Sequence, residues 1–265
     1  MEKIDKIRNP KKEKDFICAN RHKERVYLVT GSSMGIGFEI LKRLAQEGAR
    51  VILTSRRKES CSKAEETLQK LGLAYDTILA NFNNKEERAK VYELIQTKYG
   101  FLSGLVCNVA VSPHFGKSLE INEKEFSKIF DVNVKNTFFT IKEFYPLLKK
   151  AENASILIVA SVAGYLPFTG IGVYSISKTT LLGMVKLLAS ELASDGIRVN
   201  GIAPGIIKTR FAEAIVDSDF AKTNFLGRPG ITEECGGISA FLLSEDASYI
   251  TGEIYGITGG VLGKF

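Results

Sequence analysis

Several residue types that mark particular protein classes are scarce in this chain of 265 residues. It has two histidines, His22 and His114, and no cluster with metal-ligand spacing, so we expect no metal site. Its four cysteines are far apart and form no Cys-x-x-Cys, which favours reduced thiols over disulfides. No segment approaches the ~18 consecutive apolar residues of a membrane span. We therefore expect a protein without metal, disulfide or membrane partner.

The net charge of +6 is distributed unevenly. Residues 1–25 hold nine Lys or Arg against five Asp or Glu, and thus four of the six net charges. We treat residues 1–24 as a basic N-terminal extension and residues 25–265 as the folded domain. Such extensions are usually solvated, with nucleic acid or an anionic surface as the alternative partner; we expect no nucleic-acid binding. The extension lacks the apolar core of a signal peptide, so we expect a cytoplasmic protein.

Short apolar runs alternate with longer helical patterns from residue 26 on. The pattern predicts strands at 26–30, 50–55, 75–81, 102–110, 154–161, 197–205 and 253–260. It predicts helices at 37–48, 61–72, 85–100, 126–150 and 173–194. This alternation is typical of βαβ units. We predict a single α/β domain: a Rossmann-like, doubly wound parallel sheet of about seven strands with helices on both faces. Residues 206–229 fit neither pattern, and we expect them to form a mobile substrate lid.

A glycine-rich turn, "TGSSMGIG", joins the first strand to the first helix. Glycines permit a tight turn and a close approach of the backbone, and a helix N-terminus favours negative charge, so the turn predicts a pyrophosphate site. The alternative is a plain glycine-rich turn. The candidate contacts are Gly31, Ser33, Met34, Gly35, Ile36 and Gly37.

The second strand ends in "TSRRK", where dinucleotide-binding folds contact the adenine ribose. An acidic residue at this point favours NAD, but the chain has Ser55, Arg56 and Arg57. Guanidinium groups bind phosphate through paired hydrogen bonds. The segment therefore indicates NADP(H), with a solvated basic loop as the alternative.

Further motifs follow in a fixed order. "YSISK" places Tyr174 four residues before Lys178, Ser161 lies thirteen residues before Tyr174, and "APGIIKT" spans residues 203–209. With the glycine-rich turn, Asn108 in "CNVA" and Asn133 in "DVNVKN", these motifs resemble the short-chain dehydrogenase/reductase family over residues 26–260. The segments "NVAVSPHFG" and "AGYLPFTGIGVYSISKTTLLG" resemble its NADP-dependent carbonyl/retinal reductase branch. The chain ends in Gly263-Lys264-Phe265, unlike the peroxisomal tripeptide of that branch, so the cytoplasm stays our expectation, with a peroxisome or another organelle as alternatives.

The resemblance implies further contacts with the dinucleotide. These are Asn81, Phe82, Asn108, Val109, Ala110, Tyr174, Lys178, Pro204, Gly205, Ile207 and Thr209. Two positions depart from the family's Asn-Asn-Ala-Gly motif. Val109 offers no side-chain hydrogen bond, and Val111 requires an ordinary φ where glycine would be free.

Tyr174 and Lys178 lie one above the other on a helix, because residues four apart share a face. A nearby ammonium favours tyrosinate, so we expect a lowered pKa for the Tyr174 phenol. The resemblance implies that Tyr174 is the general acid, that Ser161 binds the developing alkoxide and that Lys178 binds the nicotinamide ribose. It also implies that Asn133 holds a water linked to Lys178. Taken singly, each residue has a structural alternative, as a cap, a core group or a solvated charge.

The predicted reaction is NADPH-dependent reduction of ketones or aldehydes with bulky apolar, aromatic, dicarbonyl or retinoid-like groups. Candidate pocket residues are Ser161, His114, Phe115, Tyr165, Leu166, Phe168 and Phe211, with Phe220, Phe225 and Leu226 in the expected lid. The aromatic residues could equally pack on the core. The family implies a homotetramer built by helices 126–150 and 173–194 and the C-terminal segment. The alternatives are a 3-oxoacyl-[acyl-carrier-protein] reductase and a non-catalytic dinucleotide sensor.

Overall fold

The computed structural model describes residues 20–213, 215–216 and 219–261. Its strands are β1 (Val26–Val29), β2 (Arg50–Ser55), β3 (Tyr75–Leu79), β4 (Gly104–Cys107), β5 (Ser155–Val159), β6 (Arg198–Pro204) and β7 (Ile254–Ile257). They form one seven-stranded sheet in the order β3-β2-β1-β4-β5-β6-β7, and every neighbouring pair is parallel. The chain changes direction across the sheet between β1 and β4, and this switch point is where open α/β sheets bind ligands.

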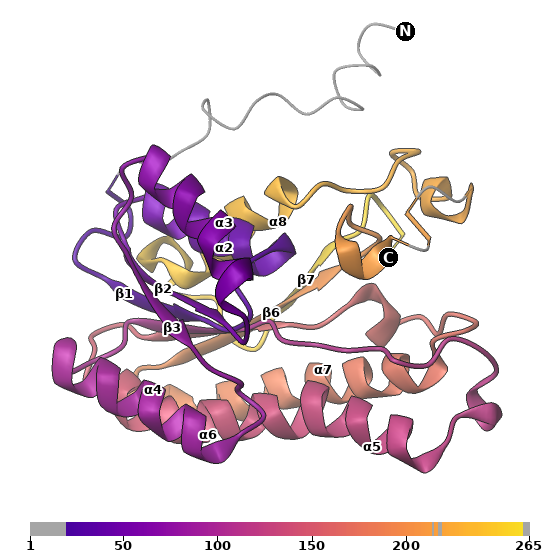
Figure 1. The fold of residues 1–265 in the computed structure, drawn as a ribbon, viewed down its shortest axis with the longest axis horizontal. Helices are drawn as coiled ribbons and strands as arrows, with labels where there is room; N and C mark the ends of the chain where they lie inside the picture. Colours follow the sequence, from indigo (N-terminus) through magenta and orange to yellow (C-terminus); the bar gives the residue numbers. More distant parts are fainter. Residues whose placement is uncertain (1–19, 214, 217–218, 262–265) are drawn as a thin grey trace, which may run out of the picture.

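Helices cover both faces of the sheet (Figure 1). One face carries α2 (Gly35–Gln46), α3 (Lys58–Lys70) and α8 (Glu233–Leu243), and the other carries α4 (Lys85–Lys98), α6 (Asn136–Leu148) and α7 (Gly172–Leu192), with α5 (Glu123–Phe130) at its end. A separate apolar core lies on each face. The predicted single, doubly wound α/β domain is therefore confirmed.

Short helical turns complete the described chain. They are η2 (Ser118–Glu120), η3 (Asp131–Lys135), η4 (Val162–Gly164), η5 (Ala193–Asp195), η6 (Arg210–Ala212), η7 (Asp219–Lys222) and η8 (Glu245–Ala247). The single helix expected over residues 126–150 is in fact α5 and α6 joined by η3, a π-helical turn. Such π-turns inside helices occur often at functional sites, and Asn133 lies in this one.

Helix α8 was not predicted from the sequence, because Gly236 and Gly237 weaken its helical pattern. The structure shows why glycine stands at one of them. A Cβ on Gly236 would lie 3.2 Å from the backbone oxygen of Glu39 and 3.3 Å from Cβ of Arg43, both in α2. The close packing of α8 on α2 therefore favours a residue without a side chain.

Two segments expected from the sequence remain, the basic N-terminal extension and the lid. Residues 1–19, most of the expected basic extension, lie outside the described residues. The expected lid contains η6 and η7, and a parallel bridge between Ile207 and Gly230 holds its two ends together. Within the described part of the chain, no helix combines the length and apolarity needed to cross a membrane. The same residues contain no group of His, Cys, Asp or Glu side chains able to hold a metal.

Candidate active site

The glycine-rich turn adopts a conformation that depends on its glycines. Gly31 and Gly35 have φ angles of 61° and 62°, in the left-handed region that glycine enters freely. A Cβ on Gly37 would lie 2.4 Å from Nδ2 of Asn108 and 2.7 Å from the backbone oxygen of Gly31. Nδ2 of Asn108 donates to the backbone oxygens of Thr30 and Gly31, at 3.1 Å each. The turn after β1 is thus held closely against the segment after β4.

The N-terminus of α2 opens at this turn. Its N-cap, Met34, makes no side-chain hydrogen bond to the first turn, and that turn has no acidic residue. Its amide donors and the positive end of the helix dipole remain available for an anion. Thr209 packs beside this turn, with its Cγ2 3.6 Å from where a Cβ of Gly35 would be. The cradle of glycines and free amides fits the pyrophosphate of a dinucleotide.

The end of β2 is tied to the same turn through Ser55. Its Oγ accepts hydrogen bonds from Oγ of Ser33 and from the amide of Arg57, both at 3.2 Å. The guanidiniums of Arg56 and Arg57 are exposed and form no ion pair with any residue that the structure describes. Two cations without a carboxylate partner therefore border the groove where an adenine ribose would lie.

The other expected cofactor contacts also follow strand ends, but they differ in accessibility. Phe82 is only 3% exposed and packs against Phe144 in the core, so only its backbone could meet a ligand. Asn81 caps the turn after β3, where its Oδ1 accepts from the amide of Asn83. Val109 lies over the glycine-rich turn, with Cγ2 3.0 Å from the position of a Gly31 Cβ. The methyl group of Thr209 packs against Gly35 in the glycine-rich turn.

Tyr174, Ser161 and Lys178 come together at the carboxyl ends of β5 and β6. Tyr174 is buried on α7, and its phenol lies next to the side chain of Ser161. Ser161 directly follows β5 and caps η4, where its Oγ accepts from the amide of Ala163 at 3.1 Å. Nζ of Lys178 donates to the backbone oxygen of Val159 at 2.8 Å and lies 5.7 Å from the centre of the Tyr174 ring. The expected pairing of Tyr174 and Lys178 on one helix face is present.

The pKa values of this pair differ from the expectation. Burial raises the pKa of Tyr174 to about 12, and the hydrogen bond from Ser161 opposes that rise. Burial also lowers the pKa of Lys178 to about 7. The expected lowering of the phenol pKa is therefore absent from the protein alone, because the burial of Tyr174 itself has the largest effect on its pKa.

Asn133 is fully buried, and both hydrogens of its side-chain amide are donated within the protein. Its Oδ1 accepts from the amide of Val111 at 2.8 Å, while Nδ2 donates to the oxygen of Val111 at 3.0 Å and to Oγ of Ser177 at 2.9 Å. Oγ of Ser177 in turn donates to the backbone oxygen of Tyr174 at 2.6 Å. Asn133 therefore links the segment after β4 to the helix that carries Tyr174.

The expected pocket residues are only partly brought together. The ring of Phe211 lies 5.6 Å from that of Tyr174, centre to centre, although Phe211 is largely exposed. His114 bonds its own loop, through the oxygen of Lys117 at 3.1 Å. Phe115 is 73% exposed and packs beside Gly170. Tyr165 is partly buried, and desolvation raises the pKa of its phenol.

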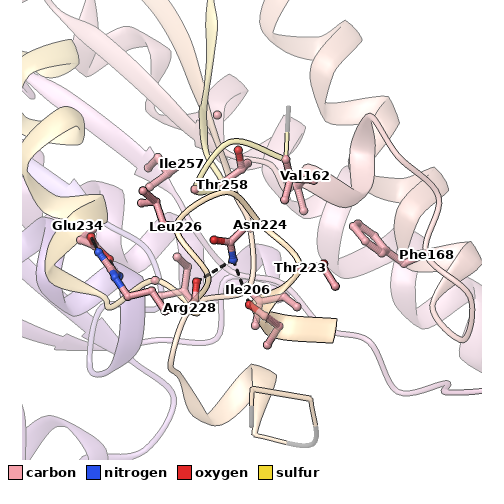
Figure 2. A pocket seen from close by; sticks show the side chains of 17 residues that line it. Val162, Phe168, Ile206, Thr223, Asn224, Leu226, Arg228, Glu234, Ile257 and Thr258 are labelled. Atoms are coloured by element: carbon pink, nitrogen blue, oxygen red, sulfur yellow. Dashed lines mark hydrogen bonds and ion pairs between the residues drawn. The ribbon is translucent and has the colours of Figure 1, made fainter. Parts of the chain in front are cut away.

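A cavity of about 270 Å³ lies beside this site (Figure 2). Of the pocket residues expected from the sequence, it contains Phe168 together with Leu226 of the expected lid. Its other walls include Val162, Ile206, Asn224, Arg228, Ile257 and Thr258. Ile206, Asn224 and Arg228 belong to the expected lid, whereas Val162, Ile257 and Thr258 had no signal in the sequence, because only the fold brings their segments to the cavity.

The sequence model of the family described as "Enoyl-(Acyl carrier protein) reductase" matches residues 31–262. With the parallel sheet, the glycine-rich turn and the Ser161–Tyr174–Lys178 arrangement, this match defines the class of protein: the chain belongs to the short-chain dehydrogenase/reductase family, whose members are oxidoreductases that use a nicotinamide dinucleotide.

Particular relatives can then be named. The chain is 42% identical to dehydrogenase/reductase SDR family member 4 of Oryctolagus cuniculus over 241 residues, covering 89% of this chain and 93% of that protein. It is 40% identical to the Homo sapiens protein of the same name, over 89% of this chain and 87% of that protein.

Solved structures agree with this family. A short-chain type dehydrogenase/reductase from Mycobacterium ulcerans superimposes with a TM-score of 0.85 at 28% identity, covering 90% of each chain. Levodione reductase superimposes with a TM-score of 0.85 at 25% identity, covering 89% of this chain and 97% of the other. The predicted family membership is confirmed.

Proposed function

We propose that this protein is an NADPH-dependent carbonyl reductase that converts ketones or aldehydes with bulky apolar, aromatic, dicarbonyl or retinoid-like groups into alcohols. The observation that carries the proposal is the buried phenol of Tyr174, which lies beside the hydroxyl of Ser161 at the end of β5. Two neighbouring hydroxyl groups suit a carbonyl oxygen, which gains negative charge as it is reduced.

In this proposal a bound nicotinamide dinucleotide supplies the hydride. Ser161 donates a hydrogen bond to the carbonyl oxygen of the substrate, and Tyr174 gives its phenolic proton to the same oxygen. General acid catalysis of this kind contributes about 10²–10⁴-fold to a rate. A protonated Lys178 stabilises the tyrosinate that remains and binds the ribose beside it. Asn133 positions α7 through Ser177. Both hydrogens of its side-chain amide are used within the protein, so the water expected from the family would donate to an oxygen of Asn133.

NADPH, rather than NADH, is the cofactor of this proposal. A 2′-phosphate on the adenine ribose would add negative charge next to Arg56 and Arg57, which lack a carboxylate partner in the described structure. The hydroxyl of Ser55 connects this segment to the glycine-rich turn, because it accepts hydrogen bonds from the hydroxyl of Ser33 and from the amide of Arg57. The remaining cofactor contacts are those expected from the sequence, with Phe82 restricted to its backbone.

The substrate and assembly follow from the same proposal. The segment 206–229 acts as the lid, and Phe211 covers Tyr174. The name of levodione reductase, one of the similar structures, indicates reduction of a dicarbonyl compound, which supports this substrate class. We further propose a cytoplasmic homotetramer whose contacts use α5, α6 and α7. We also propose that residues 1–19 are an accessory extension that catalysis does not require, whereas residues 20–24 belong to the folded domain, because His22 is fully buried.

A substrate panel tests the proposal. NADPH consumption would be followed with an aromatic diketone and, separately, with an acetoacetyl thioester, and each reaction would be repeated with NADH. We expect the diketone to be reduced faster and NADPH to be preferred. Faster reduction of the thioester would support the acyl-carrier reductase instead, and binding of NADPH without any turnover would support the non-catalytic sensor.

A further inference from the structure

The turn after β3, residues 80–84, runs beside the end of β2, where the dinucleotide groove begins. Strands β2 and β3 pair up to their last residues, and the amide of Ala80 donates to the backbone oxygen of Ser55 at 2.9 Å. Ser55 is followed by Arg56 and Arg57, the proposed site of the 2′-phosphate. An adenine base attached to that ribose would therefore meet this turn.

A buried arginine on α4 reaches back to the turn. Arg88 is 6% exposed, and its Nη1 donates to the backbone oxygen of Phe82 at 2.6 Å. Its Nε and Nη2 donate to the two carboxylate oxygens of Glu143 on α6, at 2.7 and 2.8 Å. Paired bonds of this kind fix the plane of the guanidinium. The remaining donor of Arg88 is thus held in one direction, onto the oxygen of Phe82.

The peptide group between Phe82 and Asn83, here called the 82–83 peptide, passes this constraint on to a side chain. Its oxygen accepts from Arg88, and its N–H donates to Oδ1 of Asn81 at 3.2 Å. The oxygen and the N–H of a trans peptide point in opposite directions, so fixing one also fixes the other. The amide of Asn81 is therefore oriented with its Oδ1 toward the turn.

The rest of Asn81 is held within the turn as well. Its backbone amide donates to Oε2 of Glu87 at 2.7 Å, and its backbone oxygen accepts from the amide of Asn84 at 2.9 Å. Nδ2 is the remaining polar group, and it donates to no residue that the structure describes. A free N–H donor suits the ring nitrogens of adenine, which are acceptors.

Stability alone does not explain an arginine at this buried position. A buried ion pair can often be replaced by apolar side chains of similar size without loss of stability. The neighbouring core offers apolar partners, since the ring of Phe82 packs against that of Phe144. What an apolar residue at position 88 could not supply is a donor directed at the oxygen of Phe82.

We propose that Arg88 is a positioning residue for the dinucleotide: through the 82–83 peptide it orients Asn81, so that Nδ2 donates to an acceptor nitrogen of the adenine. Glu143 holds the guanidinium in place and has no contact with the cofactor itself. The proposal rests on the dinucleotide site proposed above, and it does not depend on which carbonyl compound is reduced.

The first test measures binding of adenosine 2′,5′-bisphosphate, which contains the adenine half of NADPH and no nicotinamide, by calorimetry. We expect Arg88→Met to weaken this binding by about fivefold, the effect of about one neutral hydrogen bond. With reduced nicotinamide mononucleotide as hydride donor and an aromatic diketone as substrate, kcat/KM should stay at the wild-type value, because that donor has no adenine. The matched control is Arg50→Met, which removes an arginine paired with Asp76 near the start of β2, at the opposite edge of the sheet. It should change neither value.

Unchanged binding of the bisphosphate in Arg88→Met would overturn the proposal. The binding measurement needs no turnover, so its outcome is separate from that of the carbonyl-reductase function. If the wild-type protein does not bind the bisphosphate, the proposed dinucleotide site fails, and the role of Arg88 fails with it.

The second test asks whether Arg88 acts through Asn81. Asn81→Ala should weaken binding of the bisphosphate by about the same factor as Arg88→Met. In the double variant the arginine change should have little further effect, because the amide that it orients is already absent. Losses that multiply in the double variant would overturn the assignment.

The third test separates orientation from folding. Arg88→Met leaves the carboxylate of Glu143 without its partner, so the melting temperature should fall together with the affinity. The double variant Arg88→Met/Glu143→Leu removes that carboxylate and should recover the melting temperature. Its affinity for the bisphosphate should stay low, because the donor to Phe82 is still missing. Recovery of both would show a purely structural role and overturn the proposal.

Discussion

Nζ of Lys178 donates a hydrogen bond to the backbone oxygen of Val159, 2.8 Å away, at the carboxyl end of β5. The lysine is 2% exposed, so this carbonyl replaces the water that an ammonium would otherwise bind. Lys178 and Tyr174 are one helical turn apart, and the contact between them is from Nζ to the ring, 5.7 Å from its centre. In the protein alone, therefore, the sheet rather than the phenol holds the lysine.

The burial of Lys178 predicts a stability that depends on pH. Its pKa is about 7 in the folded protein and 10.5 as an ordinary lysine, so between these values the unfolded chain binds more protons. The stability contributed by this group therefore rises as pH increases from 7 to 10.5. We expect Lys178→Met to flatten this part of the curve when urea unfolding is measured without cofactor across that range. The same slope in the variant and the wild type would contradict the assignment of the shift to Lys178.

Tyr174→Phe should lower kcat/KM for carbonyl reduction by about 10³-fold or more, because the proton donor is lost while the ring stays. Binding of NADPH, measured by fluorescence titration, should change little. Tyr75→Phe is the matched control, since it removes a hydroxyl on β3 that bonds only Gln69 in the described structure. Turnover by Tyr174→Phe at the wild-type rate would reject the catalytic role of the phenol.

Gly37→Ala should both destabilise the protein and weaken dinucleotide binding. The new methyl group would lie 2.4 Å from Nδ2 of Asn108, so the turn after β1 must move; overpacking of this kind costs about 1–3 kcal/mol. The control is Gly183→Ala on α7, where nothing lies within 4 Å of the added carbon. That change should leave binding intact and stabilise the helix by up to about 1 kcal/mol. Thermal unfolding with and without NADPH distinguishes the two effects.

Replacement of Arg56 and Arg57 by alanine should raise the KM for NADPH by about tenfold to a hundredfold and leave the KM for NADH nearly unchanged, because only NADPH carries the 2′-phosphate. Raised salt should weaken NADPH binding to the wild type more than to the double variant. Lys63→Ala, an exposed change on α3, provides the control for a general loss of positive charge. A parallel rise in both KM values would instead indicate damage to the groove.

His22 predicts a sensitivity to acid that is unrelated to the active site. Its Nδ1 lies 2.8 Å from the hydroxyl of Tyr27 and its Nε2 3.1 Å from the backbone oxygen of Ala240, while Glu47 lies nearby. Burial lowers the pKa of His22 from 6.5 to about 4, so the unfolded chain gains a proton first as the solution is acidified. Stability contributed by this neutral imidazole is therefore lost as pH falls from 6.5 to about 4. His22→Gln should have a smaller loss over that interval in urea unfolding, with curves that run parallel above pH 7.

The sequence predicted the layers of the fold because buried parallel strands are continuously apolar and the helices between them are periodic. The prediction of helices from the sequence failed where packing between elements overrides the local helix preference of the residues. Gly236 and Gly237 hid α8, since the reason for Gly236 is the backbone of α2. The expected helix over 126–150 contains a π-turn at Asn133, which depends on contacts with Val111 and Ser177 from other elements.

The candidate active site was also predictable only in part. Motif order was enough to bring Ser161, Tyr174 and Lys178 together, because each follows or faces a strand end at one edge of the sheet. The pKa shifts were not predictable, since the spacing of Tyr174 and Lys178 says nothing about how deeply either is desolvated. The position of the cavity was not predictable either, because its walls come from the ends of β5, β6 and β7 and from residues 221–230, which only the fold brings together.

The buried ring of Tyr27 on β1 lies against Gly104 on β4. A Cβ on Gly104 would come within 2.6 Å of Cε1 of that ring, and the Tyr27 hydroxyl contacts His22 on one side and the backbone oxygen of Leu243 on the other. Positions 27 and 104 are therefore expected to change together in evolution. An alanine or valine at position 104 would require a smaller residue at position 27. That smaller residue would in turn remove the phenol that hydrogen-bonds the imidazole of His22.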